Sequence, residues 1–199
     1  MNYNFFILII NIIFLRICLS DLNEKHKEEI LFEHNRYRQL IAKGMISGQP
    51  PAANMVKMTW NEESAEKAQR KADTCEFSHD SKQDRSYSHH EWVGQNIAMS
   101  SGRKISNGLK LWFNEVKGYS YSDNSCSLNT CGHYTQVIWA KSKELGCGIS
   151  KCSHGRFLIN FLVCNYGPGG NFNSELPYES GPACSKCISG TTCDGGLCN

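Results

Sequence analysis

The chain has 199 residues, with 21 lysines and arginines against 19 aspartates and glutamates, and it contains 11 cysteines. The near balance of charge leaves no basic stripe, so nucleic acid is excluded as an expected partner. Beyond the N-terminus, no apolar run approaches the ~20 residues of a transmembrane helix, so no transmembrane segment is expected.

Residues 1–20 are interpreted as a secretory signal peptide. The run from Phe5 to Leu15 is almost purely apolar, and small residues stand at the positions that a signal peptidase inspects. The run is too short and too poorly flanked to span a membrane, although the usual basic start is missing and a retained N-terminal anchor is the alternative. Cleavage would remove Cys18 and leave ten cysteines, which indicates five disulfides in a secreted, extracellular protein. Zinc is the competing use of cysteine, but the only CxxC pair lacks partners at finger spacing.

Three helices are predicted from the spacing of apolar residues. The first covers residues 24–43 and is ended by Gly44. The second begins after Asn61, a suitable N-cap, and runs to Cys75 with an inner face of small residues that allows close approach to a sheet or another helix. The third covers residues 106–119.

The second half of the chain predicts a short helix and an antiparallel hairpin. Residues 94–99 resemble a strand, and residues 131–139 a short helix. Residues 145–152 and 157–166 are expected to pair as a hairpin closed by residues 153–156. With helices early and late and few, antiparallel strands, the pattern indicates a layered α+β domain.

The placement of the cysteines on these elements favours three disulfides. One crosses the predicted hairpin, one closes a small loop, and the remaining one ties the second helix to the sheet. They are Cys147–Cys164, Cys126–Cys131 and Cys75–Cys152. From Gly181 onward four cysteines fall close together, and we expect a separate small knot held by its own bridges.

Six segments in order carry a family resemblance. They are Phe77–His79, Gly94–Asn96, Trp112–Val116, Gly132–Trp139, Leu145–Gly148 and Val163–Phe172. Together they resemble the CAP superfamily, which groups cysteine-rich secretory proteins, antigen 5 venom allergens and plant pathogenesis-related proteins. The antigen 5 branch is the most similar, given residues 34–38 and 49–55.

The resemblance implies a domain organisation and a fold. Residues 21–180 would form the CAP (SCP) domain, a three-layer α-β-α sandwich with an antiparallel sheet in the middle. Residues 181–199 would form a hinge-like, cysteine-rich tail. The resemblance also implies the tail pairing, Cys184–Cys193 and Cys187–Cys198.

The same resemblance implies a shallow cleft that holds two histidines and two acidic residues. These positions map to His79, Gln95, Glu115 and His133. Gln95 departs from the glutamate usual in the wider family, and an amide neither acts as a carboxylate base nor brings negative charge to a metal. His79 and His133 form only a partial zinc site, so we expect weak, exchangeable zinc binding at most and no required cofactor. Without the resemblance, the histidines would be hydrogen-bonded core residues and Glu115 a solvated helix charge.

A further histidine pair, His89 and His90, lies in the polar stretch 81–91. That stretch is expected to be a loop, and we expect both of its histidines to be solvated. They are therefore not assigned to the metal site.

The function implied is that of a secreted, non-enzymatic effector of the venom allergen 5 type, expected to be a monomer. Its expected ligand is a sterol or fatty acid in apolar grooves between helices, or an extracellular target protein. The alternative is a divalent-metal-dependent hydrolase in which a histidine acts as general base and Glu115 orients it. No nucleophile motif such as GxSxG is present, so no catalytic residue is assigned. A third hypothesis is a structural or defence protein with a vestigial cleft.

Overall fold

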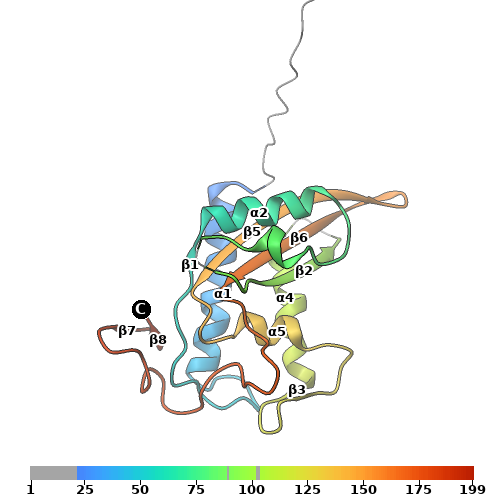
Figure 1. The fold of residues 1–199 in the computed structure, drawn as a ribbon. Coiled ribbons are helices and arrows are strands. Elements are labelled where there is room, and N and C mark those ends of the chain that lie inside the picture. Colours follow the sequence, from blue (N-terminus) through green and yellow to red (C-terminus); the bar gives the residue numbers. More distant parts are fainter. Residues whose placement is uncertain (1–21, 89, 102–103) are drawn as a thin grey trace, which may run out of the picture.

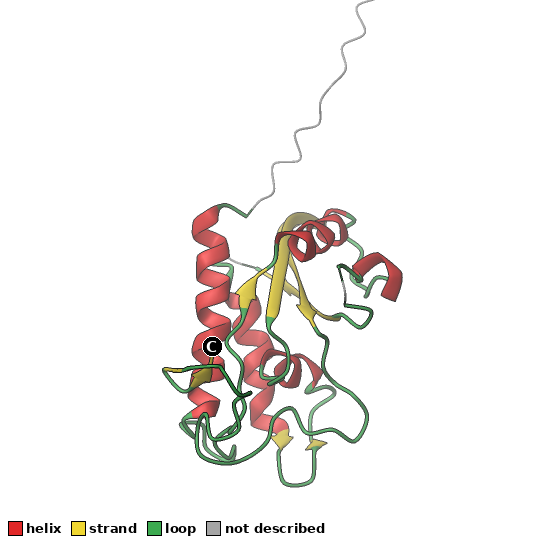
Figure 2. Cartoon of the chain, turned by 60° about the vertical axis from the view of Figure 1, so that its left-hand side comes forward, coloured by secondary structure: helices red, strands yellow, loops and turns green. Residues whose placement is uncertain are grey.

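A computed structural model describes residues 22–88, 90–101 and 104–199. The predicted signal peptide and His89 therefore lie outside the described residues. A four-stranded sheet runs between two helical layers (Figures 1 and 2). The strand order is β1 (Thr59–Trp60), β5 (Glu144–His154), β6 (Phe157–Gly167) and β2 (Gly94–Ser100). The predicted α+β, three-layer architecture is confirmed.

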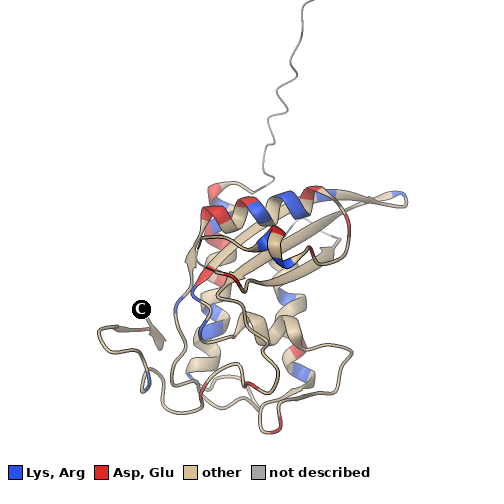
Figure 3. Ribbon diagram, in the orientation of Figure 1, with Lys and Arg blue, Asp and Glu red and all other residues tan. Residues whose placement is uncertain are grey.

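The helices are distributed unequally over the two faces of the sheet. The short helix α3 lies beside α2, while α2 covers one face of the sheet and the other long helices cover the opposite face (Figure 1). Their bounds are α1 Glu24–Ala42, α2 Glu62–Asp73, α3 Lys82–Arg85, α4 Ser106–Asn114 and α5 Gly132–Val137. Helix α2 carries acidic residues in its first turn and basic residues in its last turn, so both signs of charge lie along it, in keeping with the balanced composition (Figure 3).

Helix α2 approaches the sheet closely because both sides of the contact are small. Asn61 caps its start, since its Oδ1 atom accepts a hydrogen bond from the main-chain N–H of Ser64 at 2.9 Å. Its alanines are buried. A Cβ atom on Gly146 or Gly148 of β5 would overlap the backbone of α2. The helix ends at Asp73, two residues earlier than expected, so Cys75 is an exposed residue beyond it.

Strand β1 departs from the expected antiparallel pattern. Strands β5, β6 and β2 are antiparallel neighbours, and the β5–β6 hairpin turns at Gly155 and Arg156. The two-residue strand β1 instead pairs parallel with β5, through Thr59 with Glu144 and Trp60 with Leu145. A strand this short has too few residues to show the period-two pattern from which a strand is predicted.

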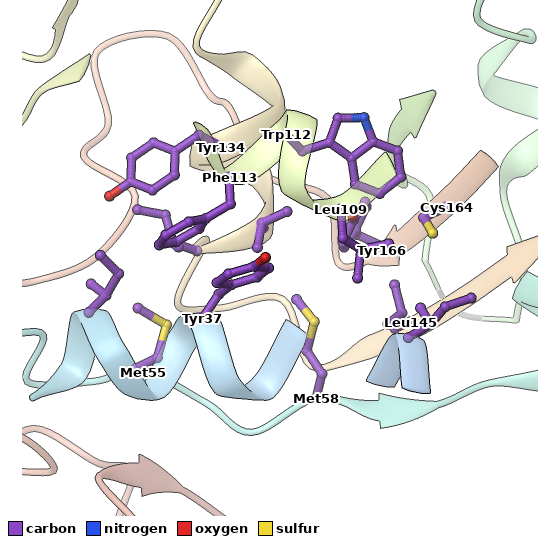
Figure 4. Packing of buried hydrophobic residues seen from close by; sticks show 14 of the residues in the cluster. Tyr37, Met55, Met58, Leu109, Trp112, Phe113, Tyr134, Leu145, Cys164 and Tyr166 are labelled. Carbon is purple, nitrogen blue, oxygen red and sulfur yellow. The ribbon is translucent and has the colours of Figure 1, made fainter. Parts of the chain in front are cut away.

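The main core lies between the sheet and helices α1, α4 and α5 (Figure 4). Tyr37 and Phe113 stack their rings there with centroids 4.0 Å apart. A smaller apolar cluster fills the space between the sheet and α2. Its members are Ala68, Ala72, Ile97, Cys152, Phe161 and Val163.

Arg38 fastens α1 to the loops around the core. Its guanidinium is fully buried and, within the part of the chain that the structure describes, donates hydrogen bonds of 2.6–3.0 Å to main-chain oxygens only. The acceptors belong to Val56, Val137, Trp139, Ala140 and Ser142. Burial lowers the pKa of Arg38 to about 9, so the group stays charged at neutral pH. The carbonyl dipoles therefore compensate a buried cation without a carboxylate.

All five expected disulfides are present. The tail forms a small hairpin of its own, β7 (Cys193–Asp194) with β8 (Leu197–Cys198). It is not the separate knot that we expected, because Leu197 is fully buried and belongs to the main core. Two further strands, β3 (Tyr119–Ser120) and β4 (Ser125–Cys126), form a second small hairpin.

Among the described residues, no helix has the length and the apolar run that crossing a bilayer requires.

Candidate functional site

Helix α5 is capped from outside its own sequence. Its N-cap residue, Cys131, makes no capping hydrogen bond because its sulfur is bonded to Cys126. Glu115 supplies the acceptor: its Oε2 atom accepts from the main-chain N–H groups of His133 at 3.0 Å and Tyr134 at 3.1 Å. N–H groups of a first turn have no acceptor inside their helix. The Glu115 carboxylate thus does for α5 what an N-cap side chain does elsewhere.

The same carboxylate holds the imidazole of His133. Glu115 Oε1 lies 2.6 Å from Nδ1 of His133, and since an ionised carboxylate only accepts, Nδ1 carries the proton. The ring also stacks with Trp112, at 6.3 Å between centroids and 16° between planes. The side chains of Glu115 and His133 are 14% and 25% exposed, so only their edges reach solvent.

A change of helix type places Glu115 at this point. The predicted helix 106–119 is one α-helix only to Asn114, and residues Glu115–Gly118 continue as a 3-10 helix. Leu109, Trp112 and Phe113 are buried as expected. Glu115 therefore lies where the apolar stripe ends, directed at the start of α5.

His79 is held by the residue that departs from the family pattern. Gln95 donates from Nε2 to Oδ1 of Asn165 at 2.9 Å, which turns its Oε1 atom toward His79. Oε1 lies 3.0 Å from Nδ1 of His79 and accepts a hydrogen bond from it. The amide oxygen thus occupies the place from which a glutamate would bring a negative charge to His79.

The four predicted residues form two pairs on either side of the edge strand β2. Gln95 and its neighbour Asn96 point to opposite faces, as successive residues of a strand do. Gln95 contacts His79, while the Asn96 side chain donates to the main-chain oxygen of His133 at 3.0 Å. The structure therefore brings His79 to Gln95 and Glu115 to His133, at the first residues of one strand.

A hollow of about 160 Å³ opens beside the first pair. Its lining contains His79 and Gln95 together with Gln136 of α5, while Glu115 and His133 lie outside it. The Gln136 side chain is fixed there, because its Oε1 atom accepts from the main-chain N–H of Gly170 at 2.9 Å and its amide donates to Ser142 Oγ at 3.1 Å. One wall of the hollow is therefore built by α5.

These pairs offer two imidazoles as metal ligands, since the carboxylate of Glu115 is already bonded to the backbone of α5 and to His133. Among the described residues, no group of three or more His, Cys, Asp or Glu side chains is placed to hold a metal ion. Protein zinc sites have three or four protein ligands, and Gln95 replaces the acid that would add one. His79 and His133 alone fit zinc poorly, so no chemical step is derived through a metal.

His90 is buried, which corrects the expectation that it is solvated. Its Nε2 atom lies 3.3 Å from Oε2 of Glu144, and its ring meets the Tyr87 ring edge-on at 5.2 Å. Tyr87 is buried too, and desolvation raises the pKa of its hydroxyl. The surrounding residues are not all loop, because α3 lies within them. No periodic apolar pattern in the polar stretch 81–91 signals this burial.

Residues 31–166 match the family described as CAP, the cysteine-rich secretory protein family. Venom allergen 5 of Vespa velutina is 42% identical over 170 residues, which cover 80% of this chain and 83% of that protein. The structure of Schistosoma mansoni venom allergen-like protein 4 (SmVAL4) superposes with a TM-score of 0.70 at 35% identity, covering 83% of this chain and all of the other. The crystal structure of NaASP2 with Zn²⁺ has a TM-score of 0.76 at 32% identity, covering 89% and 97%.

Proposed function

Since the chain belongs to the cysteine-rich secretory protein (CAP) family, we propose that it is a secreted effector of the venom allergen 5 type that acts by binding and not by catalysis. The observation that carries this proposal is the engagement of Glu115, whose two carboxylate oxygens serve the backbone of α5 and the ring of His133. A carboxylate used in this way stabilises a helix. The acidic member of the expected cleft thus has a structural role.

The surroundings of the two histidines also support a non-enzymatic role. A nucleophile supplied by the protein would be a hydroxyl or thiol within hydrogen-bond reach of the general base. In the described part of the chain, the ring contacts of His79 and His133 are an amide, a carboxylate and an indole. The ten cysteines of this part are all bonded in disulfides, so none is a free nucleophile.

The ligand that we propose is a lipid, such as a sterol or fatty acid, or else an extracellular target protein. Helices α1 and α4 are closed against each other by the stacked rings of Tyr37 and Phe113. A lipid would therefore occupy a hollow at the surface and not the space between these two helices.

Lipid extraction tests this proposal. The protein is purified from its native secretion and extracted with organic solvent, and the extract is identified by mass spectrometry. We expect one lipid class in near-stoichiometric amount. If repeated preparations contain no bound lipid, the lipid role is refuted and binding to an extracellular target protein remains as the proposed function.

The second candidate is a divalent-metal-dependent hydrolase, and the 2.6 Å contact between Glu115 and His133 is the observation that favours it. A histidine oriented by an acid is the arrangement of an activated base. If this is the function, His133→Ala abolishes cleavage while the variant stays folded.

The remaining expectations stand as proposals. We propose that residues 21–180 form the domain and residues 181–199 its tail, that residues 1–20 are a cleaved signal peptide, and that the chain is a monomer. NaASP2 was crystallised with Zn²⁺. For this chain we propose weak, exchangeable zinc binding through His79 and His133, and no required cofactor.

A further inference from the structure

The tail and the segment that leads into β1 enclose a hollow of about 540 Å³, far from the histidine pairs in the sequence. Main-chain hydrogen bonds dock the tail there: Cys198 N–H donates to the oxygen of Met55 at 2.8 Å, and Lys57 N–H donates to the oxygen of Cys198 at 2.9 Å. Lys186 N–H donates to the oxygen of Ala53 at 3.0 Å. Two disulfides brace the tail from within. The hollow is therefore built into the fold, and its volume lies within the range of ligand sites.

Apolar groups make up much of the lining of this hollow. Val56 and the disulfide-bonded Cys198 belong to it, and Thr59 and Thr191 add methyl groups. Ile188 also lines the hollow, with 75% of its surface exposed. Other large apolar side chains of this protein are exposed to a similar extent, so what matters for Ile188 is its place in the lining and not its exposure. These apolar groups suit an aliphatic chain.

Lysines form the rim, and most of them are already paired. Lys57 lies 2.8 Å from Asp194, Lys186 lies 2.7 Å from Glu179, and Lys141 lies 3.4 Å from Glu175. The main-chain oxygen of Asn199, which also lines the hollow, accepts from the main-chain N–H of Thr192 at 2.9 Å.

Lys143 is the exception on this rim. It lines the hollow, and within the described residues its ammonium group has no ion-pair or hydrogen-bond partner. Glu179, the acidic side chain in the lining, is held by Lys186 and by the side-chain amide of Asn54. Among the described residues, the lining therefore holds one lysine without an acidic partner beside its apolar groups.

We infer that this hollow binds a single-chain amphiphile with an anionic head group, with the head at Lys143 and the chain over Val56 and Ile188. This inference rests on the proposed function in one respect, that the protein binds a ligand, and it assigns the site and the ligand class. A carboxylate and a phosphate head would be recognised by the same ammonium group. The stems of the rim lysines would cover the chain while their charges stay in water.

The experiment uses the full mature chain and the fluorescent probe 11-(dansylamino)undecanoic acid. Bound probe is displaced with palmitate, with lysophosphatidic acid and with uncharged hexadecanol. We expect the two anions to displace the probe and hexadecanol to do so at least tenfold more weakly, since a charged contact contributes about a factor of ten. The order of palmitate and lysophosphatidic acid tells a carboxylate site from a phosphate site.

Two variants locate the site, each with a matched control. Lys143→Gln removes the contact with the head group, and Ile188→Asn removes the contact with the aliphatic chain. Each substitution should weaken binding of the probe by about tenfold. The controls are Lys110→Gln and Leu111→Asn on α4, which remove the same charge and the same kind of exposed apolar side chain elsewhere.

Three results would overturn the inference. If Lys143→Gln and Ile188→Asn bind the probe as their controls do, a lipid role survives but lies at another site. If hexadecanol competes as well as palmitate, the head group is not recognised. If the wild type binds neither probe nor competitors, both this site and the proposed lipid role are wrong.

Discussion

Replacing Glu115 tests whether its carboxylate stabilises the fold. In Glu115→Ala, the first-turn N–H groups of His133 and Tyr134 lose their acceptor, and the imidazole of His133 loses its partner. A hydrogen bond to a charged group contributes about 1.5–3 kcal/mol, and a lost N-cap costs about 1 kcal/mol. Because the three bonds share one carboxylate, their contributions do not add in full. We expect the free energy of unfolding to fall by about 3 kcal/mol in total.

Glu115→Gln separates the charge from the shape of the side chain. The amide keeps one accepting oxygen, so we expect about half of the loss found for alanine. The assay is urea unfolding followed by tryptophan fluorescence with the disulfides intact, comparing midpoints and slopes. The control is Glu66→Ala on α2, an exposed glutamate whose removal should cost less than about 0.5 kcal/mol.

The structural role of Glu115 would be refuted by a specific result. If Glu115→Ala unfolds at the same urea concentration as Glu66→Ala, the carboxylate does not stabilise α5. Glu115 would then be free for a chemical role, and the hydrolase hypothesis would gain weight.

Three further predictions concern pH, disulfides and zinc. Burial lowers the pKa of His34 from 6.5 to about 4, so between these pH values the unfolded chain binds more protons than the folded one. The free energy of unfolding should therefore fall by up to about 3 kcal/mol as the pH drops from 6.5 to 4. His34→Gln should lack this loss when urea unfolding is measured against pH, and the same dependence of stability on pH in the variant would contradict the argument. Removing the disulfide Cys75–Cys152, which spans a sequence separation of 77, should lower the free energy of unfolding by about 4 kcal/mol, and removing Cys126–Cys131, which spans 5, by about 2 kcal/mol. Calorimetry that shows the reverse order would refute this loop-length argument. Gln95→Glu should raise the affinity for zinc by about tenfold or more in titration calorimetry, and the double variant His79→Ala/His133→Ala is the control. Identical isotherms for the wild type, Gln95→Glu and the double variant would show that these residues form no metal site.

The sequence predicts the elements with long, regular signals. Helix α1 is nineteen residues long and shows its apolar spacing plainly, and Asn61 marks the start of α2 by its chemistry. The β5–β6 hairpin has two eleven-residue strands, which place Cys147 opposite Cys164. Local patterns of this length leave few alternatives for these elements, while their arrangement in three layers was implied by the family resemblance.

What the sequence could not predict depends on contacts between distant segments. The change to a 3-10 helix at Glu115 occurs where this residue bonds to α5, and the buried His90 contacts Glu144, 54 residues further on. The parallel pairing of β1 and the docking of the tail through Leu197 are likewise long-range. Of the site, the resemblance supplied the four residues, but their division into two pairs across β2 required the structure.

The most direct test of binding without catalysis is a cleavage assay. The purified mature chain is incubated with a broad peptide library, with and without added zinc, and products are counted by mass spectrometry beside a His133→Ala variant checked for folding. We predict that both proteins yield the same background of products. Cleavage by the wild type that is lost in the folded His133→Ala variant would contradict the account.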